Sequence, residues 1–367
     1  MEPRHCARFK ASSLESFYGI DSTLLPNNPE AIIQFPYGFR VVEVRPRGKG
    51  SGYYLYFVKR VNMSSMKAAW MLKLATGCRK PSLAGLKDTC AVAYQYISLK
   101  CSHTPPLTIS IGNLGFKAWL VGMGGRFNPG SHEGNIFRVR ISTRLPKTFC
   151  SRLEKLSWIP GFFGPQRFGV DRPNSHLYAL HTLKGDLERL IAESLYRYPG
   201  EWRSCPGDYE RRLLKSPWRP QLPRVVFEAL QSFLFNEALS EALRRGLNPE
   251  MIGEKRIWVS CPGGFRVRVP AARLPHERLS TRKTLWARIV SEVSKEAGID
   301  LKLLGYKAGL RPALRPLVYP VCRVKCRPGE GEVLAILALP PGAYATIAFR
   351  TAALIDWDES YSACVRI

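Results

Sequence analysis

Hydrophobic and polar residues alternate along several segments in the first half of the chain, and this pattern predicts β-strands. The alternation covers residues 39–44, 53–58, 92–98 and 134–142. Successive side chains of a strand point to opposite faces of its sheet, so each segment offers one face to a core. The Gly-rich stretch 48–52 between the first two segments predicts that they form a hairpin.

Other segments carry apolar residues at the spacing of an α-helix. Ser64 and Ser65 can cap the N-terminus of a helix that ends at Gly77. A longer helix over residues 224–245 presents apolar side chains at helical spacing, and Gly246 ends it. We expect this second helix to be a core element, and shorter helices to cover residues 149–158, 175–183, 187–196 and 284–297.

The end of the chain returns to a β-pattern. Strands are predicted over residues 317–325, 332–339 and 344–349, and Pro-Pro-Gly at residues 340–342 supplies a turn between the last two. The stretch 248–316 before them is dense in Arg and Lys, and we expect it to form a module of its own.

One turn places a charged pair between two strands. An apolar run stops at Gly85, the turn presents Lys87 and Asp88, and an alternating segment begins at Val92. Gly85 permits backbone angles that a larger residue resists, so the turn can bend tightly and direct Asp88 into a cleft. A Lys-Asp pair in a turn is also a common solvated surface feature, and the turn alone does not decide between the two interpretations.

Composition indicates the kind of partner. The 367 residues include 55 Lys and Arg against 29 Asp and Glu, which gives a formal net charge of +26 and favours a polyanion, with nucleic acid first. A hydrophobic content of 45% supports well-buried cores for two domains, or for one with a large insertion. Because no apolar run approaches the ~20 residues of a membrane-spanning helix, and the start lacks a signal-peptide core, we expect a cytoplasmic protein.

The ten cysteines show no pattern of a metal site. They contain no Cys-x-x-Cys, and no second pair lies near Cys322 and Cys326, so we expect no zinc. In a reducing cytosol most of them would be small buried hydrophobic residues, although intracellular disulfides occur in hyperthermophiles.

Residues 160–169 combine glycines, aromatic rings and an arginine in the sequence Pro-Gly-Phe-Phe-Gly-Pro-Gln-Arg-Phe-Gly. Such a segment can be a packed turn. It can also stack on bases and contact phosphates. Both interpretations remain open.

Five segments together resemble the TruD family of tRNA pseudouridine synthases. Ala-Gly-Leu-Lys-Asp-Thr-Cys-Ala at 84–91, with Gln95, resembles the catalytic loop of that family. Gly-Asn-Ile-Phe at 134–137 resembles its Gly-Asn-x-Phe segment, and Phe-Gly-Pro-Gln-Arg-Phe-Gly at 163–169 matches its Phe-Gly-x-Gln-Arg-Phe-Gly motif. The other two are Gln-Ser-Phe-Leu-Phe-Asn at 231–236, similar to its core helix, and Leu-Pro-Pro-Gly-Ala-Tyr-Ala-Thr at 339–346, similar to its final turn and strand.

The resemblance implies an α+β fold. A catalytic domain with a mixed, largely antiparallel sheet flanked by helices would carry an inserted domain peculiar to the family, in a V-shaped molecule with a basic cleft. We place the catalytic domain at residues 1–160 and 317–367 and the inserted TRUD domain at 161–316. The family's reaction consumes no cofactor, metal or nucleotide. We also expect a monomer that binds tRNA and does not bind a membrane.

The same resemblance assigns the site residues. Asp88 would be the catalytic carboxylate with Lys87 beside it, and the substrate would contact Asn135, Phe137, Phe163, Gln166 and Arg167. The family's reaction breaks the N-glycosidic bond of a specific uridine, implied to be uridine 13 in the D arm of tRNA, turns the uracil and reattaches it through C5.

These residue types suit that chemistry. An ionised carboxylate can act as a nucleophile or as a base, and a cation such as Lys87 would hold its pKa down. A uridine flipped out of folded RNA needs an aromatic face, which Phe137 offers, although Phe in a strand is more often plain core. Asn135 could read the uracil edge with its amide.

One departure from the family supports a rival function. Family members usually carry a Lys or Arg a few residues before a Pro-Glu-Asp-Phe sequence, whereas this chain has Ile33 and Gln34 there. The basic partner of the carboxylate is therefore missing at that place, and Arg40 or Lys87 would have to replace it. The alternative is a catalytically weak RNA-binding or RNA-folding protein with the same fold, whereas the intact Gly-Leu-Lys-Asp turn favours the enzyme.

Overall fold

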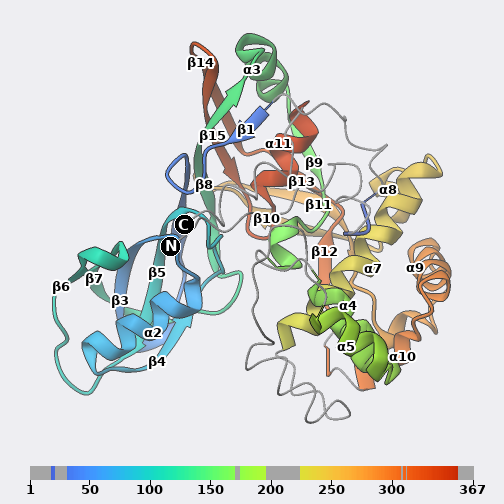
Figure 1. The fold of residues 1–367 in the computed structure, drawn as a ribbon, viewed down its shortest axis with the longest axis horizontal. Coiled ribbons are helices and arrows are strands. Elements are labelled where there is room, and N and C mark those ends of the chain that lie inside the picture. Colours follow the sequence, from blue (N-terminus) through green and yellow to red (C-terminus); the bar gives the residue numbers. More distant parts are fainter. Residues whose placement is uncertain are drawn as a thin grey trace.

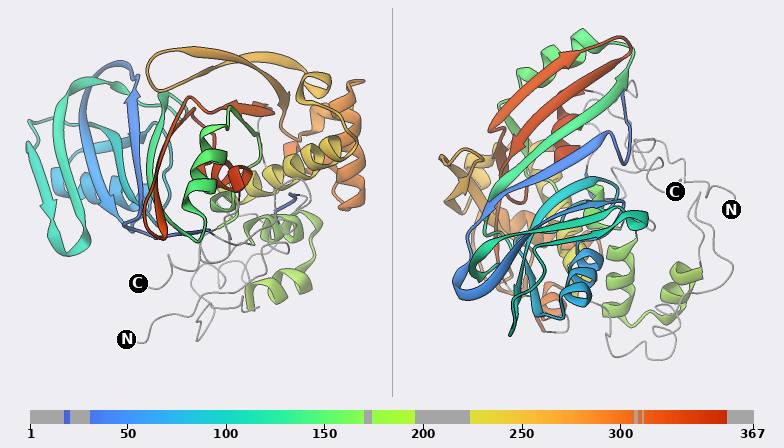
Figure 2. Two further views of the ribbon diagram at one scale, coloured as in Figure 1. Left: turned by 90° about the horizontal axis from the view of Figure 1, so that it is seen from above. Right: turned by 90° about the vertical axis from the view of Figure 1, so that its left-hand side faces the viewer.

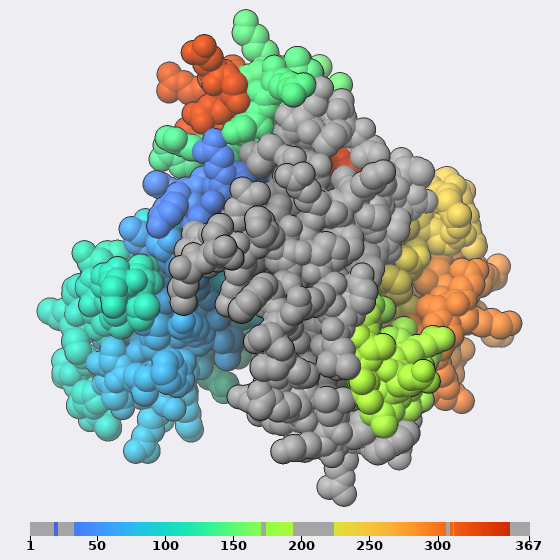
Figure 3. All heavy atoms as spheres, in the orientation of Figure 1, coloured from blue at the N-terminus to red at the C-terminus, as the bar shows by residue number. Residues whose placement is uncertain are grey.

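The computed structural model describes residues 18–20, 31–169, 174–195, 224–306, 309–310 and 312–353. They form an α+β structure in which a large sheet occupies the left and top of Figure 1 and a mainly helical part occupies the right. Figure 3 shows the surface from the same side, with the first strands and their helix on the left and the helical part on the right.

The large sheet is mixed, as the resemblance implies, and ten described strands belong to it. The strand order is β14-β15-β8-β2-β5-β3-β7-β6, with β1 paired to β8 and β4 paired to β5. Neighbouring strands are antiparallel except β2 and β5, which are parallel. The strands are β1 (Ala31–Ile33), β2 (Phe39–Pro46), β3 (Lys49–Val61), β4 (Arg79–Leu83), β5 (Val92–Lys100), β6 (Thr108–Ile111), β7 (Phe116–Arg126), β8 (His132–Thr143), β14 (Arg323–Pro328) and β15 (Glu332–Leu339).

The predicted hairpin of residues 39–58 is wrong. Strand β5 lies between β2 and β3, so the Gly-rich turn connects two strands that are not neighbours. After β3 the chain passes through helix α2 (Ser65–Thr76) and β4 before β5 returns alongside β2. Because of this crossover, β5 forms backbone hydrogen bonds with both β2 and β3. The local pattern of residues does not reveal this pairing.

Helix α2 has the predicted ends. The Ser64 hydroxyl accepts a hydrogen bond from the backbone N–H of Lys67 at 3.1 Å, and Gly77 ends the helix with φ 66°. Buried residues of α2 pack with those of β3, β5 and β7 in one hydrophobic cluster. The right-hand view of Figure 2 shows the helix on one face of these strands.

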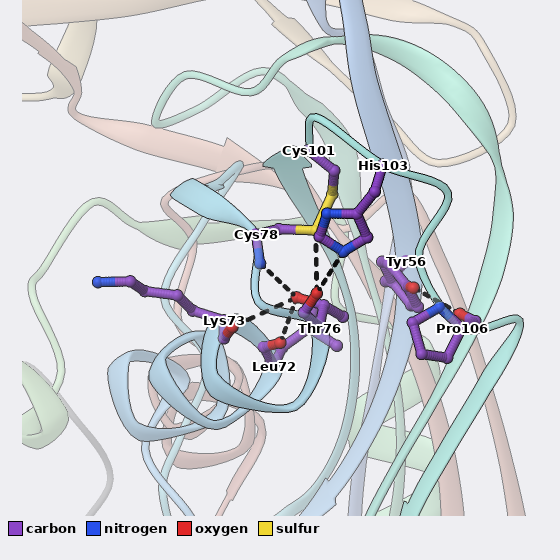
Figure 4. Close-up of a disulfide and its surroundings, with 8 residues drawn as sticks. All are labelled: Tyr56, Leu72, Lys73, Thr76, Cys78, Cys101, His103 and Pro106. Carbon is purple, nitrogen blue, oxygen red and sulfur yellow. Dashed lines mark hydrogen bonds between the residues drawn. A yellow bond between two sulfur atoms is a disulfide. The ribbon is translucent and has the colours of Figure 1, made fainter.

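Disulfides contradict the expectation that the cysteines are mostly free buried residues. Cys78 and Cys101 join the start of β4 to the end of β5 beside His103, whose Nε2 donates to the carbonyl oxygen of Thr76 at 2.9 Å (Figure 4). Two further disulfides are Cys150–Cys326 and Cys261–Cys322, and every cysteine in the described ranges, Cys90 included, is disulfide-bonded. The prediction failed because contacts distant in sequence bring these cysteines together.

Helix α7 (Arg224–Arg244) is the buried centre of the helical part, as predicted. Helices α4 (Ser175–Lys184) and α9 (Leu285–Glu296) both pack against it. Around them lie α5 (Leu187–Leu195), α8 (Pro249–Ile252), α10 (Leu301–Tyr306) and a sheet of β10 (Lys255–Ser260), β11 (Arg266–Arg273) and β12 (Leu314–Pro316). The predicted helices over 175–183, 187–196 and 284–297 are thus confirmed over their described residues.

Three elements differ from their predictions. The strand predicted over residues 317–325 is divided into β13 (Val318–Pro320) and β14, which belong to different sheets. Helix α3 (Pro146–Glu154) ends before Trp158, and residues Trp158–Pro160 form strand β9, which pairs with β13. Residues predicted as a last strand belong to helix α11 (Ala345–Ala353). The apolar run is too short to distinguish the spacing typical of a helix from the alternation typical of a strand. The helix buries Ile347, Ala348 and Phe349 completely.

Candidate active site

The turn between β4 and β5 carries Asp88, and Arg60 of strand β3 holds this turn in place. Arg60 donates through Nη1 to the carbonyl oxygen of Asp88 at 3.0 Å and through Nη2 to that of Lys87 at 2.9 Å. Its guanidinium is fully buried. The remaining acceptors are the Met63 carbonyl, Gln95 Oε1 and Ser65 Oγ. Arg60 therefore fixes the backbone of the turn, because moving the turn would leave buried donors of the guanidinium without acceptors.

Arg60 belongs to a band of buried polar residues that crosses four neighbouring strands. This polar band consists of Arg60 on β3, Gln95 on β5, Glu43 on β2 and Asn135 on β8, and Glu43 lies directly opposite Asn135. None of the four is more than 7% exposed. The polar band divides the hydrophobic cluster of the main core from the cluster under α2.

Lys87 forms an ion pair with Glu43 of the polar band. The Lys87 Nζ and Glu43 Oε1 atoms lie 2.6 Å apart with both side chains buried, and Glu43 Oε2 accepts from the backbone N–H of Tyr96 at 2.9 Å. Arg60 holds down the pKa of Asp88 more than Lys87 does.

Gly85 makes room for these side chains. A Cβ at this position would lie 2.8 Å from His132 Nε2 and 2.9 Å from Lys87 Nζ, whereas the φ angle of Gly85 lies outside the left-handed region. The predicted reason for this glycine, unusual backbone angles, is therefore wrong, and close approach is the reason. Burial and the charge of Lys87 lower the pKa of His132 to about 3, so its ring is neutral and donates through Nδ1 to the carbonyl oxygen of Gly134 at 3.0 Å.

The Asp88 carboxyl has a perturbed pKa. Burial raises its pKa to about 6, and the charges of Arg60 and Lys87 oppose that rise. The group is thus ionised at neutral pH and yet close to its protonation point. That condition suits a nucleophile or a base, and it distinguishes Asp88 from a solvated surface carboxylate.

Two amides of the polar band have open hydrogen-bonding atoms. Asn135 Oδ1 and Gln95 Nε2 are buried and have no hydrogen-bond partner among the described residues. Phe137 lies on the same face, 4% exposed, with its ring edge-on to Phe39 at 5.8 Å between centroids. An open acceptor and an open donor fit a polar ligand, whereas Phe137 packs in the core.

The motif at residues 163–169 is a turn packed on helix α7. Asn236 Oδ1 accepts from the Phe163 N–H at 2.8 Å, and its Nδ2 donates to the Phe163 carbonyl at 3.0 Å. Arg167 donates to Ser232 Oγ at 3.0 Å, and its Nη2 pairs with Glu228 at 3.1 Å. Gln166, beside Arg167 in the short helix η3 (Pro165–Arg167), is half-buried.

Tyr344 packs against this turn and is within electrostatic range of Asp88. Its ring packs edge-on against Phe163 at 6.2 Å between centroids, and the buried Arg315 guanidinium lies 3.6 Å from the Phe163 centroid. Burial raises the pKa of Tyr344, the charges of Arg167 and Arg315 oppose that rise, and the charge of Asp88 adds to it. Asp88 and Arg167 therefore both lie within electrostatic range of one tyrosine.

Sequence reasoning missed Arg60, Glu43 and Tyr344. Arg60 could have been found, because it shares the parity of Tyr56 and Val58, which face the core. An arginine at an inward position of a strand needs buried acceptors. Arg40, considered as the missing cation, is exposed.

Comparisons with known proteins identify relatives of this chain. The profile of the family described as tRNA pseudouridine synthase D (TruD) matches residues 31–201. A probable tRNA pseudouridine synthase D of Thermococcus sibiricus is 26% identical over 86% of this chain and 92% of its own. The tRNA pseudouridine synthase D of Legionella pneumophila is 27% identical over 89% of this chain and 95% of its own.

A solved structure shares the fold. The crystal structure of a putative tRNA pseudouridine synthase D from Methanosarcina mazei matches with a TM-score of 0.58 at 19% identity, over 92% of this chain and 97% of that one. None of the helices in the described ranges has the length and apolar character needed to cross a membrane. With the motifs, the family profile and the curated relatives in agreement, the chain belongs to the TruD family of tRNA pseudouridine synthases.

Proposed function

We propose that this chain isomerises a uridine of tRNA to pseudouridine and that Asp88 is its catalytic carboxylate. The C1′–N1 bond of the uridine breaks, the uracil turns while bound, and a C1′–C5 bond forms. The proton on C5 leaves to a base and N1 takes one up, so no other reactant is needed. By resemblance the target is uridine 13 in the D arm.

One observation carries the proposal: the pKa of the Asp88 carboxyl is raised to about 6 at the edge of a polar band that has open hydrogen-bonding atoms. A carboxylate with this pKa is ionised at neutral pH and can still accept a proton. Arg60, on another strand, would supply the cation that is missing near Ile33 and Gln34. This placement supports the enzyme over the RNA-binding alternative.

The remaining site residues divide into three groups with different proposed roles. Asn135 would accept from the uracil N3–H through its open Oδ1, and Phe137 would meet the base from within the core. Lys87 would order the Asp88 turn through its pair with Glu43. The turn of Phe163, Gln166 and Arg167 would contact the RNA beside the flipped nucleotide.

The domain boundaries belong to the same proposal. Residues 161–316 would form the inserted domain, which grips RNA backbone across a V-shaped, basic cleft from the catalytic parts at 1–160 and 317–367. The helical part in Figure 1 and the basic hairpin β10–β11 support this division. We propose that the protein works as a cytoplasmic monomer on tRNA.

The test is the substitution Asp88→Asn, which removes the charge and keeps the shape. The variant should bind tRNA with unchanged affinity, because phosphate contacts supply most of the binding, and it should make no pseudouridine. Asp186→Asn is the matched control, since Asp186 caps α5 by accepting from the Arg189 N–H and lies on another element. Pseudouridine in the tRNA is mapped by mass spectrometry.

Two outcomes separate the alternatives. Normal turnover in Asp88→Asn would disprove the assignment of the carboxylate. If the wild-type chain binds tRNA and makes no pseudouridine in any tRNA tested, the RNA-binding function replaces the enzyme.

A further inference from the structure

The large sheet has a second face, opposite Asp88, that the proposed reaction does not use. Arg60, Gln95 and Glu43 point to the face that carries the Asp88 turn, so their strand neighbours point the other way. We call this other side the outer face. Helix α2 packs on the Asp88 side, because its hydrophobic cluster contains Tyr56 and Val58, which point to the same face as Arg60.

Four aromatic rings form a cluster on the outer face across β5, β3 and β7. The ring of Phe57 lies at its centre, 4.9 Å from Tyr96, 5.8 Å from Tyr94 and 6.4 Å from Trp119, measured between centroids. Phe57 is the cross-strand partner of both Tyr96 and Trp119, so the three rings form a row. All four side chains are partly exposed.

Cations adjoin these rings in register. Lys59 is the cross-strand partner of Tyr94 on one side and of Lys117 on the other, and the Lys117 Nζ lies 5.3 Å from the centroid of Trp119. The same face continues with exposed cations over the neighbouring strands, and Glu332 lies at its rim. The cations of the outer face include Arg40, Lys59, Lys117, Arg138, Arg140 and Lys325.

A partly exposed aromatic platform beside a row of cations matches the chemistry of an unpaired RNA segment. Bases stack on aromatic side chains of a sheet, and phosphates pair with neighbouring Lys and Arg. A second copy of this chain is disfavoured, because a chain of net charge +26 would bring like charges together on this face.

We propose that the outer face binds a single-stranded RNA segment, with bases stacked on Tyr94, Tyr96, Phe57 and Trp119 and phosphates held by the adjoining cations. This site lies on the opposite side of the sheet from Asp88, so it contacts RNA other than the uridine that is isomerised. It goes beyond the proposed function and stands on its own geometry.

The probe is a fluorescein-labelled oligoadenylate of about twelve nucleotides, which contains no uridine and is long enough to cover one sheet-sized site. Its binding to the full chain is measured by fluorescence anisotropy at several salt concentrations. The double variant Tyr94→Leu/Trp119→Leu should bind it at least tenfold more weakly. Trp70→Leu, at a residue 56% exposed on α2, is the matched control and should bind it like wild type. Arg138→Gln/Arg140→Gln should reduce the salt dependence.

Photocrosslinking identifies the surface directly, since crosslinked peptides should come from β3, β5 and β7. Unchanged affinity in the Tyr94→Leu/Trp119→Leu variant, or crosslinks confined to other elements, would overturn the proposal. A wild-type chain that forms dimers through Trp119, seen by sedimentation and abolished in Trp119→Leu, would assign the face to a protein contact and overturn it too. The proposed reaction is tested separately, by pseudouridine formation in tRNA and its loss in Asp88→Asn. The oligoadenylate experiment can therefore fail without affecting the proposed reaction.

Discussion

Arg60 donates a hydrogen bond to the main-chain carbonyl oxygen of Asp88 at 3.0 Å, across 28 positions of sequence. The contact joins strand β3 to the turn between β4 and β5. The position of the candidate catalytic carboxylate therefore depends on how β3 packs beside β5. The same guanidinium charge opposes the burial that raises the Asp88 pKa. One buried side chain therefore holds the backbone of Asp88 in place and lowers the pKa of its carboxyl against the effect of burial.

Substitution of Arg60 should impair activity by two separable effects. Arg60→Lys keeps the charge and loses most of the hydrogen bonds, so turnover should fall while the pH midpoint of activity stays near that of wild type. Arg60→Gln also loses the charge, and its activity midpoint should move to higher pH because the Asp88 pKa rises further. Thermal unfolding identifies variants that fail to fold, and equal midpoints in both folded variants would contradict this role.

Asp88→Asn should stabilise the protein at alkaline pH. The folded pKa of Asp88, about 6, exceeds its ordinary value of 3.8, so ionisation costs stability above the folded pKa, and the cost disappears below pH 3.8. A rise of about two units corresponds to at most about 3 kcal/mol. The variant should therefore unfold at a higher temperature than wild type at about pH 8, with the difference vanishing near pH 4. Equal unfolding temperatures at both pH values would show an ordinary Asp88 pKa.

Phe137 and Phe39 allow a matched test of base stacking. Both rings are buried in one core and contact each other edge-on, so Phe137→Leu and Phe39→Leu should lose similar stability. Only Phe137 is proposed to meet the uracil, and stacking on a base is worth about 1 to 3 kcal/mol. Turnover should therefore fall further in Phe137→Leu. Equal turnover in the two variants would leave Phe137 as core alone.

The hairpin β10–β11 should contribute to RNA affinity and its salt dependence. Changing Lys255, Arg266 and Arg268 to Gln removes three exposed cations and should reduce the slope of log affinity against log salt by about 0.9 for each phosphate that is no longer neutralised. The control changes Lys147, Arg152 and Lys155, on α3 and at its C-terminal end, which gives the same net charge. Equal slopes in the two triple variants would remove the hairpin from the RNA interface.

Reduction of the disulfides should lower the stability of the folded protein, and it leaves the residues of the candidate active site chemically unchanged. In the chain-entropy model, loops closed by Cys78–Cys101, Cys261–Cys322 and Cys150–Cys326 are worth about 3 to 5 kcal/mol each. Unfolding temperatures with and without dithiothreitol should differ by several degrees or more. Mass spectrometry of alkylated protein verifies the pairing, and complete alkylation of the untreated native chain would refute it.

The sequence predicted an element correctly where the structure of that element depends on residues near it in the chain. Ser64 and Gly77 end α2 as predicted, because a helix end is satisfied by its own neighbours. The hairpin prediction failed because strand pairing is decided by a segment beyond α2. Residues 344–349 failed because a short apolar run fits both periodicities.

The site divides in the same way. The turn with Lys87 and Asp88 follows from a local motif. The partners Arg60 and Glu43 come from strands distant in sequence. Strand parity marks Arg60 as an inward cation, but no spacing predicts which residues these two side chains contact. The pairing of Lys87 with Glu43 also depends on β2 lying beside β5, which only the crossover produces.

The disulfide Cys150–Cys326 converts the chain between α3 and β14 into a closed covalent ring. These cysteines are 176 positions apart in sequence and 5.1 Å apart between Cα atoms. A protease cut anywhere within the ring leaves the two fragments linked until a reductant is added. Residues can also be inserted or deleted inside the ring without separating its ends, so the length of this region can vary while the large sheet keeps its edge.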